Sequence, residues 1–125
     1  MSAPPENPYG PLVPLPELTP EGLRTAVARI APGQVPALTQ HLFEAATNAQ
    51  RIGSLAPLRT FVHAWAVFVA VQRHPERAAR PRALEDLVTA GEKDPGEAIA
   101  EIIRIRATAE RETGLCGVRV PRAVE

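Results

Sequence analysis

The longest apolar stretch of the chain, residues 61–71, constrains its fold more than any other feature. Its sequence is FVHAWAVFVAV, and His63 alone interrupts it. On a helix, the large side chains form one face, and the opposite face is also apolar. A helix that is apolar on all sides is buried on all sides. We therefore expect either the central helix of a bundle or the seam of a dimer, with Trp65 largely buried.

Prolines, glycines and capping residues mark the ends of the other helices. The clearest start is Asp94-Pro95-Gly96-Glu97, which combines a capping acid, a proline in the first turn and a glutamate three residues after the cap. A proline inside a helix removes a backbone hydrogen bond, so we expect a kink or restart near Pro81. Helices are predicted after Thr19, from Val35 to Arg51, after Ser54, after His74 and after Asp94, with stops at Pro32-Gly33, Gly53, Gly91 and Gly114.

The N-terminal segment differs from the remainder in its proline content. Six of the 14 prolines fall within the first sixteen positions. Proline fixes φ and lacks an amide donor, so residues 1–18 should form a flexible, extended arm whose removal leaves the melting temperature nearly unchanged. Hydrophobic residues make up 45% of the chain, enough for a core. We predict an all-α fold, a compact bundle of about five helices over residues 19–114, followed by a tail at 115–125.

Residues suited to catalysis or metal binding are few and scattered. His41, His63 and His74 belong to different predicted segments, and Cys116 has no cysteine or histidine close in sequence. Metal sites usually show close ligand pairs. Ser54 is explained as a cap, and no glycine-rich phosphate loop occurs. We therefore expect no catalytic residues, no metal site and no cofactor, and predict that the protein is not an enzyme.

The cellular location is predicted from the cysteine content and the N-terminus. A single cysteine cannot form an intramolecular disulfide, and no basic segment followed by an apolar segment begins the chain. The apolar run at 61–71 is too short to cross a bilayer. We expect a cytoplasmic protein without a membrane partner.

Charge is balanced overall but unevenly distributed. The chain has 14 basic and 14 acidic residues. Residues 51–82 contain six arginines and one glutamate, whereas residues 83–101 contain six acids and one lysine. Adjacent blocks of opposite sign are typical of a helix pair whose charges neutralise each other.

An alternative for the basic block is a nucleic-acid face. Arg73, Arg77 and Arg80, with Arg82 close behind, would form a row if one helix ran on through Pro75. Such a row could contact phosphates. It could equally pair with acids of residues 85–94. No aromatic residues interleave the arginines, so nucleic-acid binding is the second hypothesis.

Two segments of the middle of the chain resemble a known family. They are LRTFVHAW at 58–65 and RHPERAAR at 73–80, an apolar helix carrying one tryptophan followed by a helix rich in arginine and proline. Over residues 20–90 the chain resembles small, functionally unassigned helical proteins from actinobacteria, some of them antitoxin-like in gene context. The resemblance implies a helical fold and a protein partner, and it implies no catalytic residues.

The leading functional hypothesis is a non-enzymatic protein–protein interaction module, such as an antitoxin or a regulatory subunit. The partner would be a toxin or an enzyme encoded nearby, and a homodimer is also expected. A DNA-binding regulator and an accessory subunit docked through the arm are the alternatives. Salt weakens phosphate binding steeply but not an apolar interface. The residues predicted for the protein interface are Val67, Val71, Ile99, Ile102 and Ile105.

Overall fold

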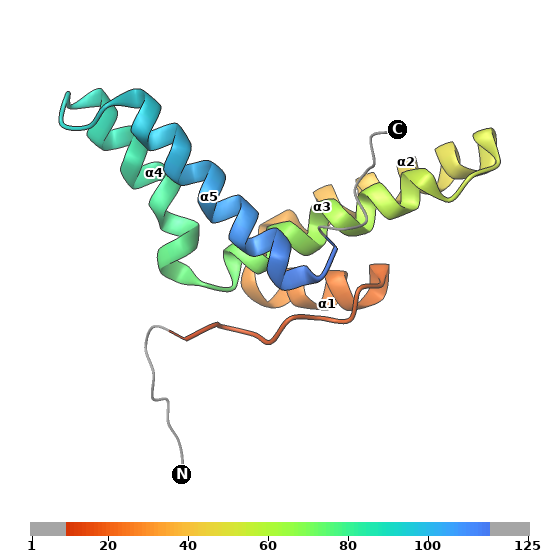
Figure 1. Cartoon of the computed structure of the whole chain (residues 1–125). Coiled ribbons are helices and arrows are strands. Elements are labelled where there is room, and N and C mark those ends of the chain that lie inside the picture. Colours follow the sequence, from red (N-terminus) through yellow and green to blue (C-terminus); the bar gives the residue numbers. More distant parts are fainter. Residues whose placement is uncertain (1–9, 116–125) are drawn as a thin grey trace, which may run out of the picture.

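A computed structural model describes residues 10–115, and this part of the chain is all-helical. Five α-helices pack together, and a single 3₁₀ turn precedes the second (Figure 1). The predicted fold class is therefore confirmed. The elements are α1 (Pro20–Ile30), η1 (Pro32–Gln34), α2 (Val35–Ile52), α3 (Ala56–Gln72), α4 (Pro75–Thr89) and α5 (Pro95–Thr113).

Local sequence signals set several helix ends where they were expected, although the N-cap of α3 is Leu55 and not the predicted Ser54. The Thr19 hydroxyl accepts a hydrogen bond from the Gly22 amide at 3.0 Å, and the Asp94 carboxylate accepts one from the Glu97 amide at 3.1 Å. Each bond satisfies an amide that the first helical turn leaves without a partner. After α5, Gly114 adopts φ 75°, a left-handed conformation that glycine enters without steric cost.

The apolar helix α3 lies at the centre of the bundle and contacts all four other helices. On one face, Phe61 and Val69 belong to the main core, which also contains Leu23 of α1 and Leu38 of α2. On another face, Val67 and Ala70 pack with Ala109 of α5. Since two separate groups of helices cover it, α3 is the central helix of a bundle. The dimer seam is not needed to bury it.

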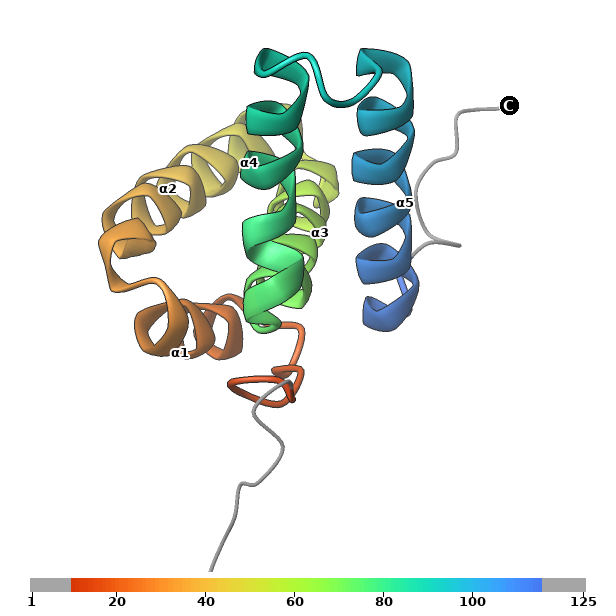
Figure 2. The same cartoon turned by 90° about the vertical axis from the view of Figure 1, so that its left-hand side faces the viewer.

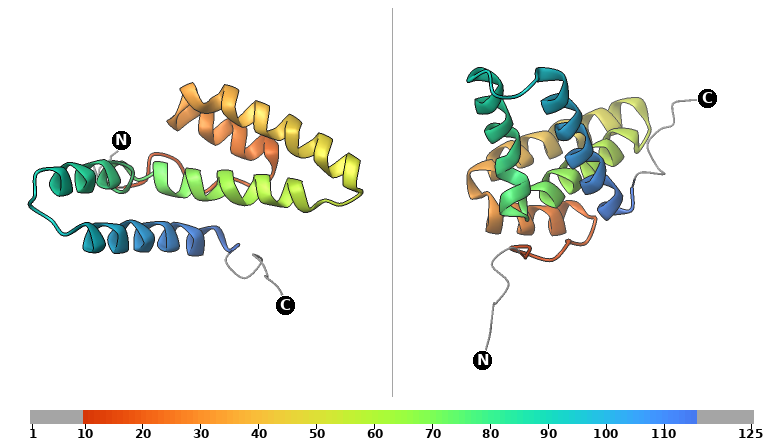
Figure 3. Two further views of the ribbon diagram at one scale, coloured as in Figure 1. Left: turned by 90° about the horizontal axis from the view of Figure 1, so that it is seen from above. Right: turned by 60° about the vertical axis from the view of Figure 1, so that its left-hand side comes forward.

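The helices form two antiparallel pairs that meet at α3. One pair is α2 with α3, and α1 packs across it. The other pair, α4 with α5, extends beyond the first, so that its far end is only two helices thick (Figures 2 and 3). In the described part of the chain, α5 contacts only α3 and α4. One side of α5 therefore has no helix packed against it.

The two prolines of α4 have different effects. Of the kink or restart expected near Pro81, no restart occurs, because α4 is a single helix from Pro75 to Thr89. At Pro75 the predicted helix start is confirmed: α3 ends at Gln72 and α4 begins at Pro75, so the arginine row does not lie on one helix that runs on through Pro75. The residue before a proline disfavours helical dihedrals, and His74 is accordingly extended at φ −108° and ψ 106°.

The described part of the N-terminal arm is packed against the bundle, which corrects the prediction of a flexible arm over residues 1–18. The side chain of Val13 is buried, and Leu18 packs on the main core. The Leu12 amide donates a hydrogen bond to the Arg73 carbonyl at 2.7 Å. Prolines hold the segment extended, and an extended segment can lay single apolar residues into a surface groove. The tail beyond Leu115 lies outside the described residues.

Trp65 packs on the main core and is partly exposed. Its indole N–H donates a hydrogen bond to Nδ1 of His41 on α2 at 3.0 Å, and its ring meets Phe68 edge-on at 5.2 Å between centroids. The indole has a polar atom that needs a partner, so it packs at the margin of the core. Phe61 is the large aromatic residue that is fully buried.

Candidate interaction surface

The arginine row predicted as a nucleic-acid face points mostly into the molecule. Arg77 makes a two-pronged ion pair with Glu112 of α5, at 3.0 and 2.9 Å, and Arg73 donates to the same carboxylate at 3.3 Å. Arg80 pairs with Glu101 of α5 at 2.7 Å. Arg82 is exposed, and the side chain of Arg80 is 41% exposed beside its partner. Of these pairs, only Arg80 with Glu101 joins the two charge blocks, because Glu112 lies outside residues 83–101. No ion pair among the described residues joins the row to the acids of residues 85–94.

These ion pairs lower the pKa values of the two glutamates that take part in them. Hydrogen bonds from Arg77, with the charges of Arg77 and Arg73, lower the pKa of Glu112. A hydrogen bond from Arg80 likewise lowers the pKa of Glu101. The guanidinium groups of Arg77 and Arg80 are already bound to carboxylates of the same chain. A phosphate could bind these arginines only by displacing the carboxylates. The ion pairs between α4 and α5 therefore hold the hairpin together.

The three histidines lie apart and have separate structural roles. His41 accepts the Trp65 hydrogen bond described above, and His63 of α3 pairs with Glu110 of α5 at 2.7 Å. His74 lies just before α4, where burial and the nearby Arg77 and Arg73 lower its pKa. Among residues 10–115, no group of three or more histidine, cysteine, aspartate or glutamate side chains could hold a metal ion. Cys116 lies outside the described residues.

The outer face of α5 carries a continuous apolar stripe. Ile99 is 58% exposed and Ile103, one helical turn later, is 61% exposed. Ala100 beside them is exposed, and Ala107 one turn further is partly exposed. Residues four apart on a helix are neighbours on its surface. We name Ile99, Ala100, Ile103 and Ala107 the α5 stripe.

The predicted interface residues divide into two groups. Val67 and Val71 pack within the chain against α5, so Val67 has no surface to offer a partner. Ile102 and Ile105 are partly buried, and Ile99 is on the surface. The prediction omitted Ile103, which is as exposed as any large apolar residue of α5. Its spacing of four residues from Ile99 could have indicated that the two share a face.

Charged residues border the α5 stripe. Glu97, Arg104 and Arg111 follow each other at intervals of seven residues, which is about two helical turns, so they lie along one flank. Arg106 lies on the other flank. All four side chains are exposed, and none of them forms an ion pair with another described residue. Charge on this flank is acidic at the N-terminal end of α5 and basic toward its C-terminal end.

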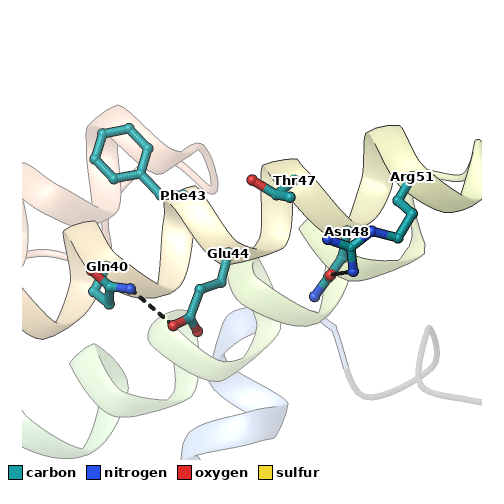
Figure 4. Close-up of a pocket in the computed structure, with 6 residues that line it drawn as sticks. All are labelled: Gln40, Phe43, Glu44, Thr47, Asn48 and Arg51. Carbon is teal, nitrogen blue, oxygen red and sulfur yellow. Dashed lines mark hydrogen bonds between the residues drawn. The ribbon is translucent and has the colours of Figure 1, made fainter.

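A second candidate surface, a shallow pocket, lies along the outer side of α2 (Figure 4). It is lined from this one helix, and its side chains partly bind one another: Gln40 donates to Glu44 at 2.9 Å, and Arg51 to Asn48 at 3.4 Å. Phe43 is its only large apolar residue. This surface is a mostly polar helix face, in contrast to the α5 stripe.

A third exposed apolar site lies at the turn between α2 and α3. Ile52 and Leu55 flank Gly53 and are both exposed. They belong to the end of one helix and the approach to the next, so they do not form a stripe along a helix. In the described part of the chain, no helix is long and apolar enough to cross a membrane.

The chain matches no protein-family model, no curated protein and no solved structure. Its own surface is therefore the basis for a functional proposal. Of the surfaces above, the α5 stripe is the one where large apolar residues, small residues and ordered charges lie along one helix.

Proposed function

We propose that this protein is a non-enzymatic interaction module that binds a helix of another protein chain through the α5 stripe. The observation that supports the proposal is the exposure of Ile99 and Ile103 on one face of α5. Exposed apolar residues arranged along a helix are the usual means by which one amphipathic helix binds another. An antitoxin or a regulatory subunit, which the resemblance of residues 58–80 suggests, works by such binding.

The two-helix thickness of the α4–α5 pair supports the same proposal. The pair has an inner seam, which Leu84 and Ala98 help to fill, and two outer sides. On the outer side of α4, the exposed residues are mainly polar, with Arg82, Glu85 and Asp86 among them. On the outer side of α5, isoleucine and alanine are exposed instead. Contact with another chain would remove this apolar surface from water.

The nucleic-acid alternative has less support. Arg77 and Arg80 are bound to Glu112 and Glu101, which leaves Arg82 as the member of the row that forms no ion pair with another described residue. The alternative of docking through the arm has a similar difficulty, because Val13 is buried against this chain. These contacts weigh against both alternatives.

Site-specific photo-crosslinking in cells of the source organism tests the proposal. A benzophenone amino acid at position 103 should give a cross-linked protein product, identifiable by mass spectrometry as a second copy or as another protein. The same amino acid at position 82, on the polar side of α4, is the control and should give none. Ile99→Asp should abolish the product at 103. The proposal is wrong if position 103 yields no product beyond that of position 82.

A further inference from the structure

We infer that the helix covering the α5 stripe is α5 of a second copy of this chain, running antiparallel to the first. This inference rests on the proposed function and specifies the partner. In the resulting dimer, the two α4–α5 hairpins would form a four-helix layer around a twofold axis near Ile103. The remaining helices of each copy would lie on either side of it.

The apolar surface suits self-association. A twofold interface is self-complementary: a residue on the axis faces its own copy, and where residue i contacts residue j of the second copy, residue j also contacts residue i of the second copy. With the axis near Ile103, this isoleucine meets its own copy, and Ala100 meets Ala107 of the second copy. Small residues at those positions let two helices approach closely, while Ile99 extends the apolar contact. The stripe thus supplies both halves of an interface.

The order of charges selects the antiparallel direction. Glu97 lies at the N-terminal end of the flank and Arg111 at its C-terminal end, fourteen residues away. In an antiparallel pair, the flank that carries Glu97 and Arg111 lies beside the same flank of the second copy, which runs in the opposite direction. Glu97 of each copy then faces Arg111 of the other, which gives two attractive contacts. In a parallel pair, this flank would instead face the other flank of the second copy, which carries Arg106, and Glu97 and Arg111 would not meet.

Arg104 lies midway on the same flank and would approach its own copy near the twofold axis. Arg104 is exposed, so solvent and salt screen the repulsion between the two Arg104 side chains. Among residues 10–115, no comparable arrangement occurs at the other exposed large apolar residues: Phe43 is alone on a polar face, and Ile52 and Leu55 lie at a turn. Leu12 and Leu15 lie in the non-helical segment before α1.

Sedimentation equilibrium of the full-length chain at several micromolar concentrations tests the inference. We expect a monomer–dimer equilibrium in which Ile103→Asp weakens the dimer roughly 100-fold, since it places an unpaired charge in an apolar contact. Ile52→Asp is the matched control, because Ile52 is also 61% exposed. That variant should remain a dimer. Circular dichroism should show unchanged helix content in both variants.

Charge reversal tests the direction of the helices. Glu97→Arg and Arg111→Glu should each weaken the dimer about tenfold at low ionic strength, because each turns two attractive contacts into repulsive ones. The double variant exchanges the charges and should restore most of the parent affinity. A parallel arrangement would show no such rescue, and this result would overturn the antiparallel assignment.

The remaining outcomes separate this inference from the proposed function. A parent chain that stays monomeric at all concentrations, or a dimer that Ile103→Asp weakens no more than Ile52→Asp does, overturns self-association through α5. If cross-linking at position 103 in cells then identifies a different protein, the proposed function stands and its partner is heterologous. If neither experiment finds a contact, both proposals fail.

Discussion

Arg77, in the first turn of α4, and Glu112, in the last turn of α5, are joined by two parallel hydrogen bonds of 3.0 and 2.9 Å. The same guanidinium donates to the Ala70 carbonyl near the end of α3 at 2.9 Å. One side chain thus connects three helices where the two halves of the molecule meet. Planar guanidinium and carboxylate groups match in this geometry, which Lys cannot reproduce.

Removing the charge of Glu112 should destabilise the fold. Glu112→Gln keeps the size of the side chain but loses the charge that Arg77 and Arg73 share, and we expect the free energy of unfolding to fall by about 1–3 kcal/mol. Urea denaturation followed by circular dichroism measures the change. Arg82→Gln removes an exposed charge on the same hairpin and should stay within about 0.5 kcal/mol of the parent. Equal stability of the two variants would contradict the role assigned to Glu112.

Stability should fall in acid through the same carboxylate. The pKa of Glu112 is held below its ordinary value of 4.5 in the folded chain. Its contribution is therefore present at pH values above 4.5 and is lost as the pH falls through the lower, folded pKa. The unfolding free energy of the parent should decrease more steeply below about pH 4.5 than that of Glu112→Gln. Denaturation curves at a series of pH values measure both slopes, and identical slopes would contradict the prediction.

His74 should respond in a separate pH range. Burial, Arg77 and Arg73 lower its pKa, so the folded chain binds a proton there less readily than the unfolded chain. Stability is therefore lost as the pH falls below the ordinary value of 6.5. His74→Gln should remove this loss and leave a flatter profile below pH 6.5. The same denaturation series tests it, and a loss of unchanged size in the variant would assign the effect to another group.

The parts of the fold that follow from local sequence were predictable. Thr19 and Asp94 cap the helices as expected, and Gly114 ends α5, because each acts through neighbouring backbone groups. The central place of α3 also followed from its sequence, since a helix apolar on all sides needs cover on all sides. These features require no knowledge of how distant segments meet.

The remaining features depend on tertiary contacts that sequence spacing does not encode. Arg77 and Glu112 are 35 residues apart, and nothing local distinguishes Glu112 from other acids of α5. The burial of Val13 depends on distant segments: its carbonyl accepts a hydrogen bond from Arg73, 60 residues away. Ile103 and Ile105 are the same residue type, two positions apart. The packing of α5 on α3 and α4 determines that Ile103 is exposed while Ile105 is partly buried.

The packed part of the N-terminal segment should contribute to stability. Val13 is 6% exposed, whereas its neighbour Leu12 is 58% exposed. Val13→Ala leaves a small cavity and should lower the free energy of unfolding by about 1–2 kcal/mol. Leu12→Ala removes a larger but exposed side chain and should change it by less than about 0.5 kcal/mol. If both variants unfold like the parent, the segment contributes nothing to the fold, as the sequence alone had predicted.

The aromatic residues of α3 should differ in how much each contributes to stability. Phe61 is fully buried, so Phe61→Ala should cost about 3–5 kcal/mol. Trp65 is partly exposed, and Trp65→Ala should cost less, about 2–3 kcal/mol, including the hydrogen bond to His41. Urea denaturation followed by circular dichroism compares the two variants, because Trp65→Ala removes the only tryptophan and with it the fluorescence signal.

A conservative variant separates the ring from its hydrogen bond. Trp65→Phe keeps an aromatic ring beside Phe68 but cannot donate to His41, so its free energy of unfolding should lie between those of the parent and Trp65→Ala. A Trp65→Ala variant less stable than Phe61→Ala would mean that the indole, and not the phenyl ring, anchors α3 in the main core.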